Sequence, residues 1–187
     1  FMPDRLSRAL RLIDDANAGD PAGLAVSYGR RMSETLDTLA PDAPETLKIA
    51  ARAQHIERWT VPRASYPEGR IAYLTWRRDL QKLHARRAGE IMAACGYAED
   101  EIARAGSLLR KERLKQDPDA QTLEDVICLV FLKYEAEPFI ARHEDDKVRD
   151  ILAKTAKKMS PRGLAAAAQV PLGERLKRLL GEALAAG

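Results

Sequence analysis

Imidazole, guanidinium and carboxylate side chains recur at helical spacing in several segments of this chain of 187 residues. Arg77 and His84 are seven residues apart, so an α-helix would present both side chains on one face. His55 and Trp59 are four residues apart and would share a face of another helix. Histidine transfers protons near neutral pH, and arginine beside aromatic rings favours planar or phosphorylated anions. These residue types predict binding of an anion, with acid–base chemistry as the alternative.

A buried carboxylate is expected at Asp125, which directly precedes the most apolar run of the chain, residues 126–132. An unpaired buried carboxylate is very costly, so Asp125 needs a partner. The expected partners come from three basic segments: His55 and Arg58, Arg77 and His84, and Arg110 and Lys111. We predict a site where the catalytic candidates His55, His84 and Asp125 meet the ligand-binding candidates Arg58, Trp59, Arg63, Tyr66, Arg77, Arg110, Lys111 and Gln121.

A structural role is the alternative interpretation of each candidate. A histidine on a helix is often a satisfied structural residue, and a tryptophan such as Trp59 often belongs to the core. Asp125 could form a purely structural ion pair, because structural networks also contain perturbed charges.

The elements expected to position these residues are all helices. Strand patterns are nearly absent, and apolar residues recur with helical periodicity almost everywhere. The predicted helices cover residues 4–17, 21–39, 44–59, 70–94, 99–111, 120–134, 145–158, 160–169 and 172–186. The predicted fold is all-α, a single-domain multi-helix bundle, with residues 2–164 as the helical domain and residues 165–187 as a C-terminal helical extension packed on it.

Composition indicates an ordinary globular protein, because 45% of the residues are hydrophobic and 32% are charged. Cys95 and Cys128 lie among apolar residues and are expected to be reduced core thiols. No window approaches the ~18 apolar residues of a membrane span, and the N-terminal residues contain no apolar signal core. We therefore expect a cytoplasmic protein with no membrane partner.

Positive charge is concentrated between Arg52 and Arg87, where nine basic and three acidic residues give a balance of +6. The whole chain carries only +3. A segment this basic usually faces an anion or simply faces water. Nucleic acid is therefore a possible partner but not the favoured one, and the amphipathic tail from Leu172 to Leu184 leaves a homodimer open.

Several ordered motifs resemble one family. They are Gln54–Trp59, Pro62–Arg63, Tyr66–Pro67, Tyr73-Leu74-x-Trp76-Arg77, Arg110–Lys111, Gln121-x-x-Glu124-Asp125-Val126, Phe131–Leu132, Lys147 and Lys154-Thr155-x-x-Lys158-Met159-Ser160. The chain resembles domain-of-unknown-function family 4202 (DUF4202) up to about Leu164. Members are often labelled glutamyl-tRNA synthetase, a name this strand-free sequence does not support. The resemblance implies a family without an established reaction.

A more distant resemblance is to the His-Asp (HD) phosphohydrolases. His84 and Asp125 are similar to the first and last ligands of that pattern. The resemblance implies an HD-like helical fold and a metal such as Mn or Fe. However, Arg110 and Lys111 stand where its His-Asp pair would be, and two cations would repel a divalent ion. We therefore expect no metal, with Mn or Fe as the leading alternative.

Three functions follow from these patterns. The first is binding of a phosphorylated or carboxylated small molecule in a basic pocket. The second is a degenerate or rearranged HD-type phosphohydrolase or lyase, with His55 or His84 as general base. The third is an RNA-binding accessory protein, whose affinity would fall steeply with salt.

Overall fold

A computed structural model describes residues 3–187, and every regular element in that range is a helix. The predicted all-α class is therefore confirmed. The chain divides into two compact units, one ending at Ala120 and the other spanning Gln121–Gly187. The domain limits predicted at residues 164 and 165 stay a prediction. None of the helices in the described range is both long enough and apolar enough to cross a membrane.

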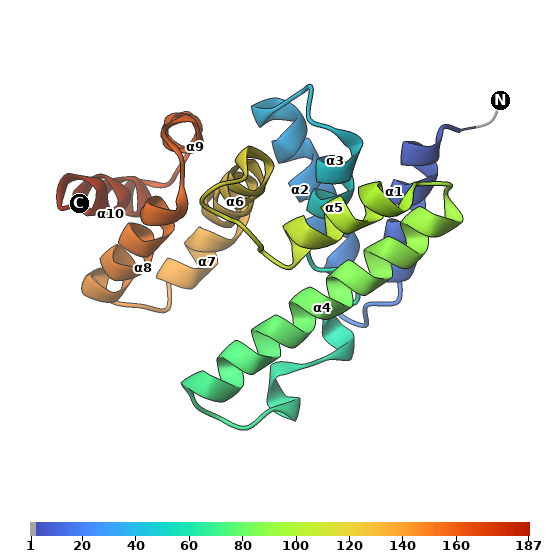
Figure 1. Cartoon of the computed structure of the whole chain (residues 1–187). Helices are drawn as coiled ribbons and strands as arrows, with labels where there is room; N and C mark the ends of the chain where they lie inside the picture. Colours follow the sequence, from blue (N-terminus) through green and yellow to red (C-terminus); the bar gives the residue numbers. More distant parts are fainter. Residues whose placement is uncertain (1–2) are drawn as a thin grey trace. The chain divides into compact units, whose positions relative to one another are not determined.

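The first unit is built around one long helix. Its elements are α1 (Arg5–Asn17), α2 (Ala25–Leu39), α3 (Glu45–Arg52), the 3₁₀ turns η1 (Arg58–Thr60) and η2 (Arg63–Ser65), α4 (Arg70–Ala94) and α5 (Glu99–Leu109). α4 packs against α5, and α3 packs against α1, α2 and α5 (Figure 1). Side chains from all five helices form the core, among them Ile13, Met32, Leu36, Leu47, Ile49, Leu80, Met92, Leu108 and Leu109.

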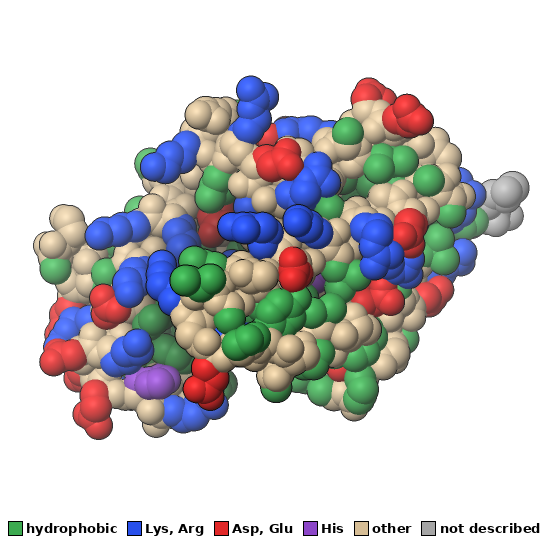
Figure 2. Space-filling view, turned by 60° about the horizontal axis from the view of Figure 1, so that its bottom comes forward, with side chains coloured by type: hydrophobic (Ala, Val, Ile, Leu, Met, Phe, Trp, Pro, Cys, Tyr) green, Lys and Arg blue, Asp and Glu red, His purple; other side chains and the backbone are tan. Residues whose placement is uncertain are grey.

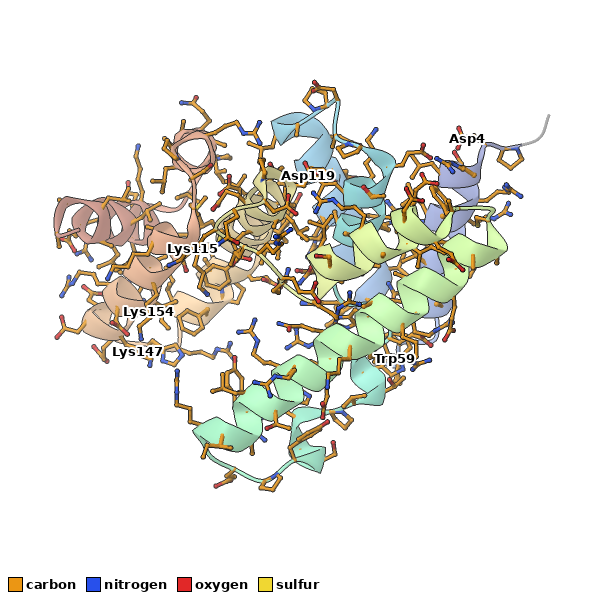
Figure 3. The ribbon with its side chains drawn as sticks, viewed as in Figure 1. Asp4, Trp59, Lys115, Asp119, Lys147 and Lys154 are labelled. Atoms are coloured by element: carbon orange, nitrogen blue, oxygen red, sulfur yellow. The ribbon has the colours of Figure 1, made fainter. Side chains whose placement is uncertain are left out.

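Polar side chains fix the starts of the first two helices. Asp4 lies at the beginning of α1 (Figure 3), and its carboxylate accepts a hydrogen bond from the N–H of Ser7 at 2.7 Å. The carboxylate of Asp20 accepts hydrogen bonds from the N–H groups of Ala22, Leu24 and Ala25 ahead of α2. These bonds satisfy amides that have no partner inside a helix, so the local sequence determines where both helices begin.

The third helix is shorter than its periodicity predicts. We expected it to reach Trp59, but α3 ends at Arg52 and the chain turns before η1. Glu57 adopts a left-handed conformation with φ of 54°, which cannot continue a right-handed helix. Its N–H donates a hydrogen bond to Oδ1 of the buried Asn17 at 3.0 Å. A tertiary contact with α1 therefore holds the turn in place.

The second unit contains most of α6 (Pro118–Val130), the π-helical turn η3 (Phe131–Glu135), α7 (Ala136–Ile140), α8 (Asp145–Lys158), α9 (Pro161–Ala167) and α10 (Glu174–Ala185). α10 packs on α8 and α7. The helix predicted to end near Tyr134 instead changes to a π turn and continues as α7, which was not predicted. Pro138 has no N–H to donate to the preceding turn, so regular α-helical bonding is interrupted there.

Burial follows the sequence pattern closely. Val126, Leu129, Val130 and Leu132 are buried, as expected for the most apolar helix. The prediction for the cysteines is confirmed, since Cys95 and Cys128 are both buried and free. Figure 2 shows basic and acidic side chains mixed with apolar ones over the face it draws, and histidine atoms occupy little of that surface.

Candidate functional site

A cavity of about 230 Å³ lies in the first unit. It is lined by Gln54, His55, Arg58, Tyr73, Arg77, Leu80, Gln81, His84 and Lys111. Three segments contribute these residues: the turn after α3, one face of α4, and Lys111, the second residue after the end of α5. The lining contains three permanent cations and no carboxylate. We refer to it below as the basic pocket.

Helix α4 contributes more than half of the lining because its spacing matches the helical repeat. Tyr73, Arg77, Gln81 and His84 follow one another at intervals of four, four and three residues, so they form a single stripe. The shared face predicted for Arg77 and His84 is thus present in the structure. Leu80 and Trp76 are buried, which anchors this part of the helix.

The turn after α3 is held by a neutral hydrogen bond on one side and an ion pair on the other. Glu57 bonds to Asn17 through its N–H, and its carboxylate forms an ion pair with Arg87 of α4. Ile56, the preceding residue, is fully buried. These contacts fix the segment between His55 and Arg58 and so position both side chains in the lining.

The His55 imidazole is neutral by geometry. Its Nε2 lies 2.9 Å from Nη1 of Arg58, and a guanidinium can only donate, so Nε2 accepts and the proton resides on Nδ1. The ring stacks on Tyr28, with centroids 4.0 Å apart. Burial, followed by the charge of Arg58, holds the pKa of His55 well below its usual range.

Arg58 is oriented by two aromatic or heteroaromatic rings. Its guanidinium lies 5.1 Å from the centre of the Trp76 ring as well as against His55. Trp76 is itself fixed, because its Nε1 donates a hydrogen bond to the carbonyl of Val61 at 2.8 Å. The positive charge of Arg58 is therefore held in one place before any ligand arrives.

Lys111 enters the basic pocket from a strained backbone position. Its φ is 60°, a left-handed conformation that costs a residue with a Cβ roughly 1–2 kcal/mol. Its Nζ donates a hydrogen bond to Oε1 of Gln54 at 3.1 Å. Strained positions of this kind cluster at functional sites, and this one brings an ammonium group into the pocket.

His84 is the least satisfied group of the pocket. The residue is 4% exposed, and its Nε2 has no hydrogen-bond partner among the described residues. Its ring centre lies 6.3 Å from that of His55. Burial, and then the charges of Arg58 and Lys111, lower the pKa of His84 to about 3. The imidazole is therefore neutral at physiological pH, with one ring nitrogen left for a ligand.

Four other predicted site residues of the first unit do not line the basic pocket. Trp59 lies in η1 (Figure 3), where a Cβ added at Gly19 would be 3.5 Å from its ring. Arg63 donates hydrogen bonds to the carbonyls of Tyr66, Pro67 and Gly69. Tyr66 donates to Asp79 at 2.5 Å, and Arg110 pairs with Glu112 at 2.7 Å. These contacts give each side chain except Trp59 a specific structural partner.

Asp125 and Gln121 belong to the second unit. Asp125 is 1% exposed, as expected, but its carboxylate is satisfied by neutral donors instead of the predicted cations. It accepts hydrogen bonds from the N–H of Ser160 at 2.8 Å, from the Ser160 hydroxyl, and from Nε2 of Gln121 at 3.0 Å. Several N–H and O–H bonds can stabilise a buried carboxylate without an opposite charge. Asp125 therefore ties α6 to the start of α9.

Four lining residues, Gln54, Tyr73, Leu80 and Gln81, were missing from the predicted site. Gln81 could have been found, because it lies four residues after Arg77 and three before His84 on the predicted stripe. Gln54 enters the pocket only because α3 ends early, which the periodicity does not show.

A metal centre would need several ligands close together. No group of three or more His, Cys, Asp or Glu residues in positions to hold a metal ion occurs within residues 3–187. His55 and His84 are the only such side chains in the lining of the basic pocket, and they are accompanied there by three cations. The chemistry of these donors favours an anion over a divalent cation.

Comparison with known protein families identifies the family of the chain. The model of the family described as Domain of unknown function (DUF4202) matches residues 7–180. No curated protein and no solved structure was found to match the chain.

Proposed function

Because this chain belongs to the DUF4202 family, whose description names no activity, we propose a function from the basic pocket itself: it binds a phosphorylated or carboxylated small molecule. The observation that carries this proposal is the charge of the lining. Arg58, Arg77 and Lys111 contribute three positive charges, and no lining side chain is acidic. An anion would relieve the repulsion among these cations and gain charge-assisted hydrogen bonds.

The preorganisation of the cations supports the proposal. Arg58 rests against Trp76 and His55, and Lys111 is bonded to Gln54. Side chains that are already held in place lose little conformational entropy when a ligand binds. Both histidines have lowered pKa values, so the positive charge of the pocket comes from groups that stay charged around neutral pH.

The distant resemblance to HD proteins is consistent with the same proposal. Lys111, which stands in place of a metal-ligating residue of that pattern, lines the basic pocket, whereas its neighbour Arg110 pairs with Glu112. The ammonium group of Lys111 would then provide the positive charge that a metal supplies in the HD pattern.

Thermal unfolding in sulfate provides the test. At constant ionic strength, replacing chloride by sulfate should raise the Tm of the wild type by several degrees, because a ligand at 100 times its Kd adds about 2.7 kcal/mol. Arg77→Met should remove at least half of this shift. Arg78→Met is the matched control: Arg78 is the next residue of α4, is also exposed, and does not line the pocket. Equal shifts in both variants, or no shift in the wild type, would contradict the proposal.

Hydrolysis of a phosphomonoester is the second candidate. It is favoured by the unpartnered Nε2 of His84, since a neutral imidazole can accept a hydrogen bond from the attacking water while the fixed cations stabilise charge developing on the phosphate. Release of inorganic phosphate from phosphomonoesters, with and without added Mn²⁺, would be measured for the wild type and for His84→Leu. Turnover that the folded variant loses would favour hydrolysis, and binding without turnover would favour the first candidate.

A further inference from the structure

Neutral polar groups share the basic pocket with the cations. Nε2 of His84 is buried and has no partner, which costs roughly 1–3 kcal/mol in the empty protein. Gln81 lies one helical turn from His84 and lines the same cavity. Gln54 accepts a hydrogen bond from Lys111 through Oε1, which leaves its NH₂ group to donate elsewhere. The cations match an anionic group, but these three neutral groups require further polar atoms on the ligand.

Hydroxyl groups suit these neutral partners best. An imidazole nitrogen can donate or accept according to its tautomer, and an amide offers both functions. A hydroxyl also donates and accepts, so it can satisfy either form, whereas an anionic oxygen can only accept. Along α4 the exposed Arg77 is followed by Gln81 and then by the buried His84. A ligand lying along this stripe would therefore meet a cation at one end and neutral groups at the other.

The size and composition of the lining limit the ligand further. A volume of about 230 Å³ is below the roughly 300–1,000 Å³ of pockets that hold drug-sized molecules. Leu80 is the one aliphatic residue of the lining. A nucleotide would extend beyond this volume into solvent, and an acyl chain would need more apolar surface.

Building on the proposed function, we propose that the ligand of the basic pocket is a small hydroxylated phosphomonoester, a sugar or polyol phosphate. Its phosphate lies against Arg58, Arg77 and Lys111, and its hydroxyl groups bond to His84 Nε2, Gln81 and Gln54. His84 and Gln81 then determine specificity, while the cations provide most of the affinity.

Calorimetric titration of the whole protein at pH 7.5 tests this proposal with four probes: inorganic phosphate, glycerol 3-phosphate, a hexose 6-phosphate and adenosine 5′-monophosphate. We expect glycerol 3-phosphate or the hexose phosphate to bind at least about tenfold more tightly than inorganic phosphate, because its hydroxyl groups add one or two neutral hydrogen bonds. His84→Leu and Gln81→Leu should each remove most of this gain and leave the affinity for inorganic phosphate within about threefold. Arg77→Met should weaken all probes.

The controls separate this inference from the function on which it rests. His143→Leu, a histidine outside the pocket, should leave every affinity unchanged. If His84→Leu does not fold, Gln81→Leu, at a half-buried position, still gives the answer. Two outcomes would overturn the inference and leave the proposed function standing. One is binding of inorganic phosphate with no higher affinity for the hydroxylated esters, and the other is tightest binding of adenosine monophosphate. Failure of all four probes to bind would count against both proposals.

Discussion

His84 shows how a single residue can be unfavourable for folding and useful for binding. Its ring is almost completely buried, its Nε2 lacks a partner, and Arg58 and Lys111 oppose its protonation. A purely structural histidine would normally have a hydrogen bond for each buried nitrogen. A buried polar group of this kind is retained where a ligand provides the missing hydrogen bond. We therefore expect a trade-off between stability and binding at this residue.

Replacing His84 by leucine should stabilise the empty protein. The substitution removes an unsatisfied buried nitrogen and adds apolar surface, so we expect the free energy of unfolding to rise by roughly 1 kcal/mol or more at pH 7. Denaturant titrations of the wild type and of His84→Leu, with His143→Leu as the control at a half-buried histidine outside the pocket, measure the change. A loss of 1 kcal/mol or more in His84→Leu would show that the imidazole contributes to folding.

Acid should destabilise the protein through the same residue. An unfolded chain protonates this imidazole below about pH 6.5, whereas the folded protein resists protonation until its pKa of about 3. The free energy of unfolding therefore falls as the pH is lowered from 6.5 towards 3, by about 2 kcal/mol between pH 7 and pH 5 from this group. His84→Leu should remove that part of the decrease in denaturant titrations at the two pH values. An unchanged pH dependence would contradict the assignment of a neutral, buried His84.

At the scale of elements, each unit contains a contact between a helix and a turn that fixes the positions of nearby side chains. In the first unit, Glu57 joins the turn after α3 to Asn17 of α1 and to Arg87 of α4, which places His55 and Arg58 opposite the stripe of α4. In the second unit, Asp125 of α6 binds Ser160, whose hydroxyl in turn accepts the N–H of Gly163 in α9. Each contact uses a buried or half-buried polar side chain to stop or start a helix.

Gly163 leaves the space that the Asp125 contact needs. A Cβ at this position would lie 2.6 Å from the carboxylate of Asp125, so Gly163→Ala must displace it from Ser160. We expect a loss of roughly 1–3 kcal/mol in the free energy of unfolding. Gly181→Ala in α10 is the matched control, since nothing lies within 4 Å of its added Cβ, and it should gain up to about 1 kcal/mol from helix propensity. Similar effects at the two glycines would argue against a tight contact between α6 and α9.

At the scale of the whole molecule, the pocket and the Asp125 contact belong to different compact units. Every lining residue of the basic pocket lies before Ala120, and Asp125, Gln121 and Ser160 lie after it. The first unit contains the segment with a balance of +6, but part of that charge is neutralised internally. Arg52 pairs with Asp14 and Arg86 with Glu90, two carboxylates that lie outside the segment. Only part of the positive charge of the basic segment therefore lies in the lining of the pocket.

Hydrogen exchange locates ligand binding within the whole protein. Saturating phosphate should slow amide exchange in residues 53–58 and 108–112, because a ligand that bonds to Arg58 and Lys111 suppresses opening of their turns. Helix α10, which packs on α7 and α8 of the second unit, serves as the internal reference. Mass-spectrometric exchange with and without phosphate makes the measurement. Protection of α10 without protection of the two turns would place the ligand elsewhere.

The sequence by itself determined the features that depend on local periodicity. The all-α class, the shared face of Arg77 and His84 on α4, and the burial of Asp125 and both cysteines follow from the spacing of apolar and polar residues along a helix. His55, Arg58 and Lys111 entered the predicted site as expected partners of Asp125, and they line the basic pocket without it.

Only the tertiary structure decided where turns end those helices and which groups form hydrogen bonds with the buried polar side chains. The left-handed conformations of Glu57 and Lys111 are unfavourable locally, so they depend on partners distant in the chain, such as Asn17 and Gln54. The choice of Ser160 instead of a cation as the partner of Asp125 likewise depends on a contact 35 residues away. Helical periodicity repeats every three to four residues and cannot encode such contacts, because they form only when the helices pack.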